Sequence, residues 1–170
     1  MGRAAVLAAA ALLLAACTGI PEGVEPVRGF EVERYLGRWY EIARLDHRFE
    51  RGLSRVTAEY SRRDDGGLRV VNRGYDAESG TWQEAVGKAY LLGPDDIGSL
   101  KVSFFGPFYG GYHVIALDTD YRWAMVSGWT HDYLWLLSRE PRLDPDVRRR
   151  LVARAREAGF PVGELIDVAH

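Results

Sequence analysis

Apolar and polar residues alternate through most of the chain between Leu36 and Arg139. A period of two is typical of strands that bury one face. Turns rich in glycine, proline and aspartate separate the runs at the spacing of roughly 8–12 residues expected for an all-β sandwich or barrel. We count about eight strands, the number that closes into a barrel able to hold one small ligand. The pattern therefore predicts an all-β domain, an eight-stranded antiparallel up-and-down barrel.

One segment near the C-terminus departs from this alternation. Asp144 suits a helix N-cap, Pro145 suits the first helical position, and Gly159 suits the end of a helix. Apolar residues recur inside the segment at a spacing of four, namely Val147, Leu151 and Ala155. We expect one α-helix that packs by this stripe against the outside of the barrel. Its arginines are expected in solvent, with contact to anionic lipid as the alternative.

The N-terminus carries a targeting signal. A short basic start and an Ala/Val/Leu run precede the single cysteine, Cys17. The run is too short to span a bilayer and has the layout of a secretory signal peptide, which we assign to residues 1–16. The sequence Leu14-Ala15-Ala16-Cys17 resembles the lipobox of bacterial lipoproteins, which implies cleavage before Cys17 and acylation of that residue; ordinary secretion is the alternative. Thr18, where an Asp would favour the inner membrane, favours the outer membrane.

Residues 17–33 contain three glycines, two prolines and few large apolar side chains. We therefore expect a lipidated N-terminus and flexible tether over 17–33, followed by one folded domain over 34–170. Lys and Arg number 22 against 24 Asp and Glu, so nothing in the charge suggests a nucleic-acid partner. With Cys17 acylated, no thiol remains for a disulfide, a thiolate metal site or a nucleophile. We expect neither a metal nor a cofactor.

Three short motifs stand in order at barrel spacing. They are Gly37 and Trp39 at the first strand, Thr119-Asp120-Tyr121 at a late turn, and Arg139 at the end of the last strand. With them the chain resembles the lipocalins, and most closely the bacterial outer-membrane lipocalins, from Tyr35 to the C-terminus. The resemblance implies that these motif residues are structural. Arg139 would cover the indole of Trp39 at the closed end of the barrel.

Strand alternation selects the side chains that face the barrel interior, here called the lumen. Small residues among them leave volume, and three tyrosines supply hydroxyls within an apolar wall, as in ligand pockets. A barrel filled by its own side chains is the alternative. The predicted ligand-contacting residues of the lumen are Val56, Ala58, Tyr60, Val70, Leu100, Val102, Phe104, Tyr112, Val114, Ala116, Val126, Tyr133 and Trp135. Leu68, Ala85, Gly87, Ala89, Ala124 and Leu137 share this orientation.

The loops opposite Trp39 are expected to form the mouth of the lumen. Its candidate ligand residues are His47, Arg48, Arg51, Phe108 and Tyr109. Arginine binds phosphate in a bidentate manner, so the mouth could accept a phosphorylated head above an acyl tail. The alternative is that the arginines only pair with neighbouring acidic residues. The aromatic loops could instead contact a membrane or a second subunit, as in a homodimer.

The family resemblance implies a binding protein anchored in the outer membrane and facing the periplasm. It would hold a lysophospholipid or fatty acid in the lumen, for storage or transport during envelope maintenance. A tetrapyrrole carrier is one alternative, but it would need an inward histidine, and His113 is predicted to face outward. A lipid-modifying enzyme is another, but the pocket cysteine that some lipocalins use has no counterpart here. We therefore expect no catalytic activity.

Overall fold

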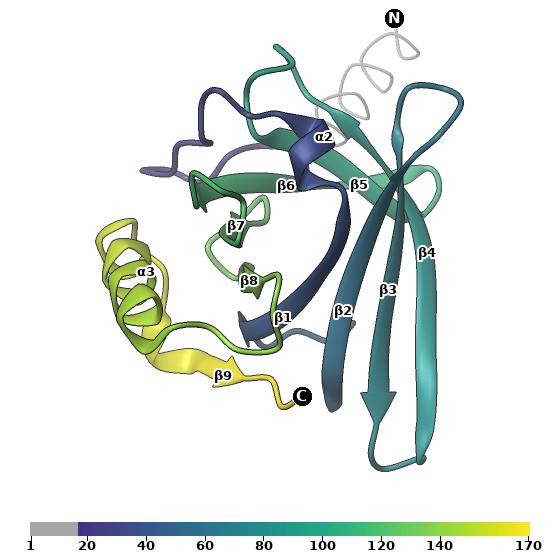
Figure 1. Cartoon of the computed structure of the whole chain (residues 1–170), viewed down its shortest axis with the longest axis vertical. Coiled ribbons are helices and arrows are strands. Elements are labelled where there is room, and N and C mark those ends of the chain that lie inside the picture. The colour runs from purple at the N-terminus through teal and green to yellow at the C-terminus, as the bar shows by residue number, and fades with distance from the viewer. Residues whose placement is uncertain (1–16) are drawn as a thin grey trace, which may run out of the picture.

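The structure, a computed structural model, describes residues 17–170, so the predicted signal peptide over residues 1–16 lies outside the described residues. Eight antiparallel strands wind in sequence order around one core (Figure 1). They are β1 (Gly37–Leu45), β2 (Leu53–Arg62), β3 (Leu68–Asp76), β4 (Thr81–Leu91), β5 (Ser99–Phe105), β6 (Phe108–Leu117), β7 (Trp123–Ser127) and β8 (Leu134–Ser138). Pairing of β1 with both β2 and β8 closes the barrel. The predicted up-and-down barrel is confirmed.

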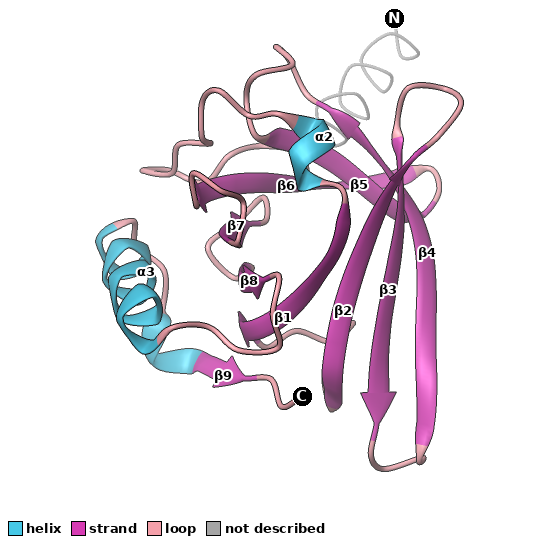
Figure 2. Cartoon of the chain, in the orientation of Figure 1, coloured by secondary structure: helices cyan, strands magenta, loops and turns pink. Residues whose placement is uncertain are grey.

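Short elements complete the fold around the barrel (Figure 2). Helix α2 (Val32–Tyr35) precedes β1, and helix α3 (Pro145–Glu157) follows β8. A 3-10 turn, η1 (Val162–Glu164), leads into a ninth strand, β9 (Leu165–Asp167), which pairs with the end of β1 beyond β8. No helix in the range 17–170 is long and apolar enough to cross a membrane.

Helix α3 forms as its sequence predicts. The Asp144 carboxylate accepts hydrogen bonds from the backbone N–H groups of Asp146 and Val147, which otherwise have no partner in the first turn. Leu151 and Ala155 are buried against the outside of the barrel. They belong to a second apolar cluster, which packs between α3 and strands β1, β6, β7 and β8.

The register shifts at β-bulges in β1, β2, β5 and β6, and the shifts in β1 and β6 change which side chains face inward. In β1 the register shifts between Glu41 and Ala43, and in β6 it shifts between Val114 and Ala116. Because a shift of one residue exchanges the two faces of a strand, alternation before a bulge cannot be extended past it. Ala116 consequently lies in the cluster beneath α3, and its predicted position in the lumen is wrong. A larger side chain there would press on α3 instead of filling the lumen.

The N-terminal segment of residues 17–30, here called the N-terminal strap, lies along the barrel wall. The Gly111 amide donates to the Cys17 carbonyl at 2.7 Å, and the amide of Val27 donates to the Val114 carbonyl at 2.8 Å. Val24 and Phe30 are buried, the former beneath α3 and the latter in the main core. The predicted flexible tether over 17–33 is therefore wrong, because its few apolar residues are spaced to anchor it to the barrel.

Candidate functional site

The end of the barrel nearest α2 is closed by the motif residues. Trp39 is fully buried, and its Nε1 donates to the carbonyl of Tyr35 at 2.9 Å. The Arg139 guanidinium lies 3.8 Å from the centre of the Trp39 ring, the contact that the family motif implied. Arg139 also donates to the carbonyls of Arg38, Arg34 and Tyr121. It therefore links α2, β1 and the β6–β7 turn into a floor.

The other motif residues hold the same end. Tyr121, in the β6–β7 turn, adopts a left-handed backbone conformation with φ of 58°, and its hydroxyl accepts a hydrogen bond from the Glu31 amide at 2.8 Å. Gly37 has φ of 92°, and a side chain there would approach Arg139. Thr119 and Asp120 are exposed in the turn, and the Thr119 carbonyl accepts from Arg34. These contacts join the β6–β7 turn, α2 and the start of β1 at the closed end.

Inward-facing residues differ in exposure along the barrel axis. Those near the floor are buried, including Leu68, Val70, Ala89 and Leu100. Towards the other end Ala58 is only half-buried, and Ala85, which the β3–β4 register places on the inner face beside Asn72, is exposed. The inner face is thus packed at the floor and accessible to solvent at the end opposite Trp39.

Most predicted lumen residues belong to this interior. Ten of them pack in one cluster: Ala58, Tyr60, Val70, Leu100, Val102, Phe104, Tyr112, Val114, Val126 and Trp135. Val56 is buried at the irregular start of β2, and Tyr133 stacks on Trp135 near the open end with ring centres 6.1 Å apart.

Three tyrosines form a layer above the floor. The hydroxyl of Tyr112 lies 2.7 Å from that of Tyr35 and accepts from the hydroxyl of Tyr60 at 2.8 Å. Burial raises the pKa of all three phenols, so they stay neutral. Their hydroxyls satisfy one another, which leaves the apolar ring edges to bound the base of the accessible part.

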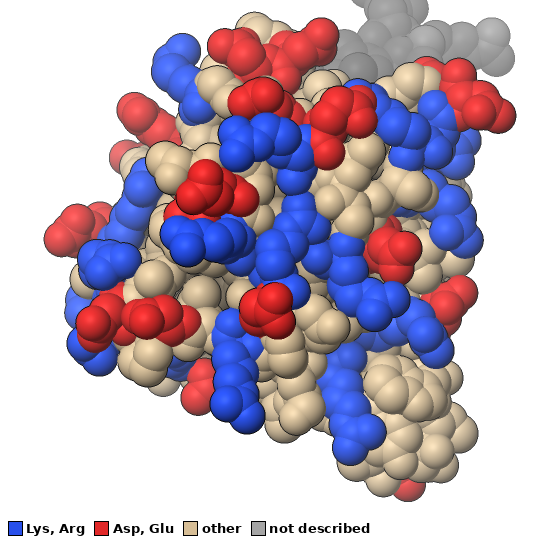
Figure 3. Space-filling model, in the orientation of Figure 1, with Lys and Arg blue, Asp and Glu red and all other residues tan. Residues whose placement is uncertain are grey.

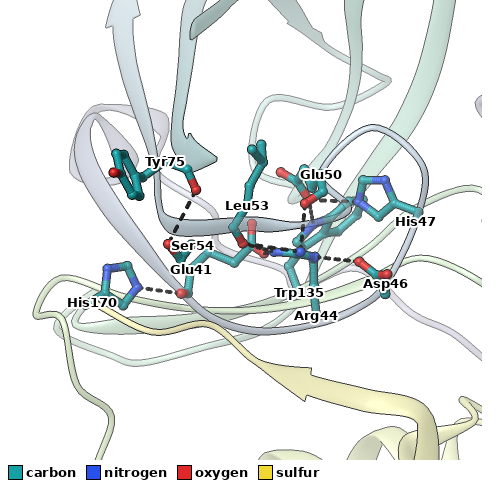
Figure 4. A network of polar contacts seen from close by, with 10 residues as sticks. All are labelled: Glu41, Arg44, Asp46, His47, Glu50, Leu53, Ser54, Tyr75, Trp135 and His170. Atoms are coloured by element: carbon teal, nitrogen blue, oxygen red, sulfur yellow. Dashed lines mark hydrogen bonds and ion pairs between the residues drawn. The ribbon is translucent and has the colours of Figure 1, made fainter. Parts of the chain in front are cut away.

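A buried polar cluster, formed by Glu41, Arg44 and Glu50, was not predicted. Figure 4 shows the Arg44 guanidinium between strand β1 and the β1–β2 loop, with the two glutamates beside it. Arg44 donates to the Glu41 carboxylate at 3.0 Å, to the Glu50 carbonyl at 2.8 Å and to Asp46 at 3.2 Å. Its side chain is only 1% exposed. The cluster therefore fixes the loop that borders the open end.

The pKa values of the two glutamates in this cluster are shifted in opposite directions. Burial, together with the nearby Glu50, raises the pKa of Glu41 well above its usual value, although Arg44 opposes this. Burial alone would also raise the pKa of Glu50, but contacts from His47 and the Trp135 Nε1–H more than offset it, so that pKa is lowered. Trp135 donates to Glu50 at 3.0 Å. The Glu50 carboxylate thus holds its charge against His47 and Trp135, whereas Glu41, the ion-pair partner of Arg44, is the carboxyl that gains a proton first.

The predicted mouth residues of the β1–β2 loop have different surroundings. His47 lies inside the rim, with Nε2 at 2.8 Å from Glu50 and its ring 5.5 Å from those of Tyr133 and Trp135. Arg51 pairs with Asp46 at 3.1 Å, so the alternative of simple ion pairing applies to it. Arg48 lies over the Phe49 ring at 4.9 Å, and no carboxylate of the described residues pairs with it.

The β7–β8 loop completes the rim. The Trp129 ring packs on Tyr133, with centres 4.4 Å apart, and lies so close to Gly110 of β6 that a side chain there would approach it to 2.7 Å. Glycine is therefore required at 110 for the loop to lean across the strand. The rim on this side consists of aromatic rings around the Glu50 carboxylate.

Tyr109 and Phe108 do not line this rim. Tyr109 lies on the outer face of the barrel, where the amines of Lys101 and Lys88 are 4.7 and 5.9 Å from its ring centre. Its predicted place at the mouth is wrong, because strand β6 already begins at Phe108 and alternation points Tyr109 outward. Phe108 is 69% exposed at the tip of the β5–β6 hairpin. Only a ligand group that protrudes from the open end would reach it.

A groove of about 610 Å³ lies outside the barrel, on the face of β1 to β4. Figure 3 shows basic side chains gathered over these strands. Four arginines and two glutamates are among the groove residues: Arg38, Arg55, Arg69, Arg73, Glu59 and Glu84. Because they point away from the interior, they cannot contact a ligand held in the lumen.

His113 is outward, as predicted. It is fully buried beneath the N-terminal strap, with Nδ1 at 2.8 Å from the Ser99 hydroxyl and Nε2 at 2.8 Å from the Gly19 carbonyl. Burial lowers its pKa, although the Gly19 carbonyl opposes this. Within residues 17–170, no group of three or more His, Cys, Asp or Glu side chains is placed to hold a metal ion.

Comparisons with known proteins agree with this architecture. Residues 30–170 match the family model described as a lipocalin-like domain. The chain is 56% identical over 163 residues to outer membrane lipoprotein Blc of Escherichia coli strain K12, covering 95% of this chain and 92% of that protein. It is 35% identical over 152 residues to temperature-induced lipocalin-1 of Arabidopsis thaliana, covering 84% and 80% of the two chains.

Among solved structures, insecticyanin from the tobacco hornworm Manduca sexta superposes with a TM-score of 0.69 at 20% identity, over 90% of this chain and 87% of that one. At this identity the likeness concerns the fold alone. Together with the family match and the floor built by Trp39 and Arg139, these findings show that the chain belongs to the lipocalin family.

Proposed function

We propose that this protein is a lipid-binding lipoprotein of the outer membrane, anchored through an acylated Cys17. It would hold one single-chain lipid, a lysophospholipid or fatty acid, with the tail in the lumen. The observation that carries the proposal is the half-open interior, in which inward residues such as Ala58 and Ala85 keep contact with solvent. The similarity to proteins named outer membrane lipoprotein supports the location.

The lumen wall suits an acyl chain. Val102, Phe104 and Trp135 are inward and only half-buried, so they offer apolar surface that a tail would cover. Covering apolar area stabilises a complex by about 25 cal/mol per Å². A charged head, by contrast, must stay hydrated or paired. The open end suits that need, because a head group there would lie in solvent near Arg48.

A tetrapyrrole carrier is less well supported. His113 is committed to Ser99 and Gly19 on the outer face, and His47 contacts Glu50 at the rim. A lipid-modifying enzyme would need a reactive group in the lumen, and the single cysteine lies outside it, against β6. The described geometry therefore favours binding over catalysis.

The test compares a large side chain introduced inside the lumen with the same side chain introduced at the neighbouring, outward-facing position. Ala85→Trp would project a ring into the lumen, whereas Val86→Trp on the same strand would project outward. Titration with a fluorescent long-chain fatty acid should show binding at least about tenfold weaker for Ala85→Trp, a loss of about 1.4 kcal/mol. Val86→Trp should bind as the parent does. Equal affinity for all three proteins would refute a lumen site.

The head-group contribution is tested separately at the rim. Arg48→Ala should weaken a lysophospholipid more than a fatty acid. The loss should be modest, about 0–1 kcal/mol, because an exposed charge interaction is screened by solvent. Arg51→Ala is the matched control, since Arg51 already pairs with Asp46. A larger effect of Arg51→Ala would show that the head lies elsewhere.

A further inference from the structure

The barrel carries an exposed apolar patch beside the strand that holds Cys17. Seven large apolar side chains in the described part of the chain are exposed, and three of them lie on strands β4, β5 and β6: Val86, Phe105 and Phe108. Phe105 and Phe108 pair across the β5–β6 hairpin and are 68% and 69% exposed. We call Val86, Phe105 and Phe108 the apolar patch.

The patch spans neighbouring strands of the sheet. Lys88 of β4 is opposite Ser103 of β5, and Val86 lies two residues further along β4, towards the end of the barrel that carries the β5–β6 hairpin. Monomeric soluble proteins seldom expose contiguous apolar surface unless it binds a partner or a membrane.

Basic and amphipathic side chains border the patch. The amines of Lys88 and Lys101 lie 5.9 and 4.7 Å from the centre of the Tyr109 ring, and no carboxylate of the described residues is paired with either amine. Tyrosine rings and lysines at the edge of an apolar surface are typical of sites that lie at the polar boundary of a bilayer. The combination fits lipid head groups of negative charge.

The N-terminal strap brings the proposed anchor to this patch. Cys17 is held on Gly111, which stands opposite Lys101 and three residues from Phe108. At about 3.3 Å per residue, the anchor emerges roughly 10 Å from the hairpin tip. Because Gly19, Val24 and Val27 contact the barrel, the strap does not act as a long flexible linker between the anchor and the domain. The position of the anchor is thus tied to the barrel.

From this arrangement we infer that the apolar patch docks on the anionic bilayer that holds the acylated Cys17, so that the open end of the lumen faces the lipid. The β5–β6 hairpin lies at the same end as the β1–β2 and β3–β4 turns, because alternate turns of an up-and-down barrel share one end. Phe105 and Phe108 enter the acyl boundary, and Lys88 and Lys101 contact phosphates. A lipid then passes between bilayer and lumen with little exposure to water. This inference rests on the proposed acylation.

The orientation is measured on the acylated full-length chain in vesicles of phosphatidylethanolamine and phosphatidylglycerol. Acylation blocks the native thiol, so one introduced cysteine carries a fluorophore. Phe108→Cys reports the hairpin, Asp95→Cys the closed end and Arg150→Cys the helix α3 side. A quencher in the acyl region should act at least about twofold more strongly at 108 than at 95 or 150. Equal quenching at the three positions would overturn the orientation.

A second pair of variants tests the function of the patch. Phe105→Ser with Phe108→Ser should slow uptake of a fluorescent lysophospholipid from these vesicles severalfold, with unchanged affinity for the same lipid in solution. Ile166→Ser, an exposed apolar residue on β9 away from the patch, is the matched control. Unchanged uptake by the double variant would overturn the docking proposal. The mass of the purified chain reports acylation independently, and absence of acyl groups would overturn the anchor and this inference together.

Discussion

Removal of the Arg44 guanidinium tests the role of the buried polar cluster. Arg44→Leu leaves Glu41, whose side chain is 5% exposed, beside Glu50 without its cation. It also removes the donor to the carbonyls of Glu50 and Leu53. Breaking a buried ion pair from one side costs about 3–5 kcal/mol. For a chain of this size the melting temperature should fall by roughly 6–20 °C.

Urea unfolding followed by circular dichroism measures the loss, with the slope checked to be constant. Arg51→Leu is the control, because Arg51 pairs with the same Asp46 in solvent at 67% exposure and should cost about 0–1 kcal/mol. Replacing Glu41 and Arg44 together by leucine should recover much of the stability, since neither member of their buried ion pair is then left without the other. The reasoning fails if the single change costs no more than the control, or if the double change is as unstable as the single one.

Three further changes are expected to separate stability from binding. Burial raises the pKa of Glu41 above its usual value of 4.5, so the stability it contributes is full below that value and is lost as pH rises through the raised folded pKa. Glu41→Gln should therefore gain in melting temperature relative to the parent as pH rises from about 4 to about 8; a constant difference would count against the raised pKa. Trp39→Ala should cost about 3–5 kcal/mol in urea unfolding and leave fatty-acid affinity intact in the folded fraction, whereas lost affinity at unchanged stability would move Trp39 into the binding site. Asp144→Ala should cost about 0.5–2 kcal/mol by thermal unfolding because two N–H groups of α3 lose their acceptor, and a neutral effect would mean that the cap is dispensable.

Sequence patterns were sufficient to predict those elements whose formation depends mainly on residues within the element itself. The alternation of apolar and polar residues predicted the strands. The N-cap at Asp144 and the apolar stripe of Leu151 and Ala155 predicted α3. The motif at Trp39 and Arg139 identified the closed end. These features are readable because the period of a strand or helix and its capping chemistry repeat within a few residues.

The misplacement of Ala116 and the failure to predict Arg44 in the interior share one physical cause. Each bulge shifts the register by one residue. Ala116 therefore lies beneath α3 and Arg44 lies in the interior, opposite to the faces that uninterrupted alternation predicts. The charge of Arg44 also hid it, because a buried guanidinium is recognisable only when its partners are known. The strap was missed because Val24 and Phe30 are too far apart to form a pattern.

The sequence by itself thus determined the barrel, its external helix, its closed end and the candidate anchor at Cys17. Only the tertiary structure decided how far the lumen is filled, which charges lie inside it and where the anchor meets the wall. Those properties depend on contacts between strands distant in the chain, such as Gly111 with Cys17 and Trp135 with Glu50. Alternation assigns a side chain to a face, but closure of the barrel determines what that face meets.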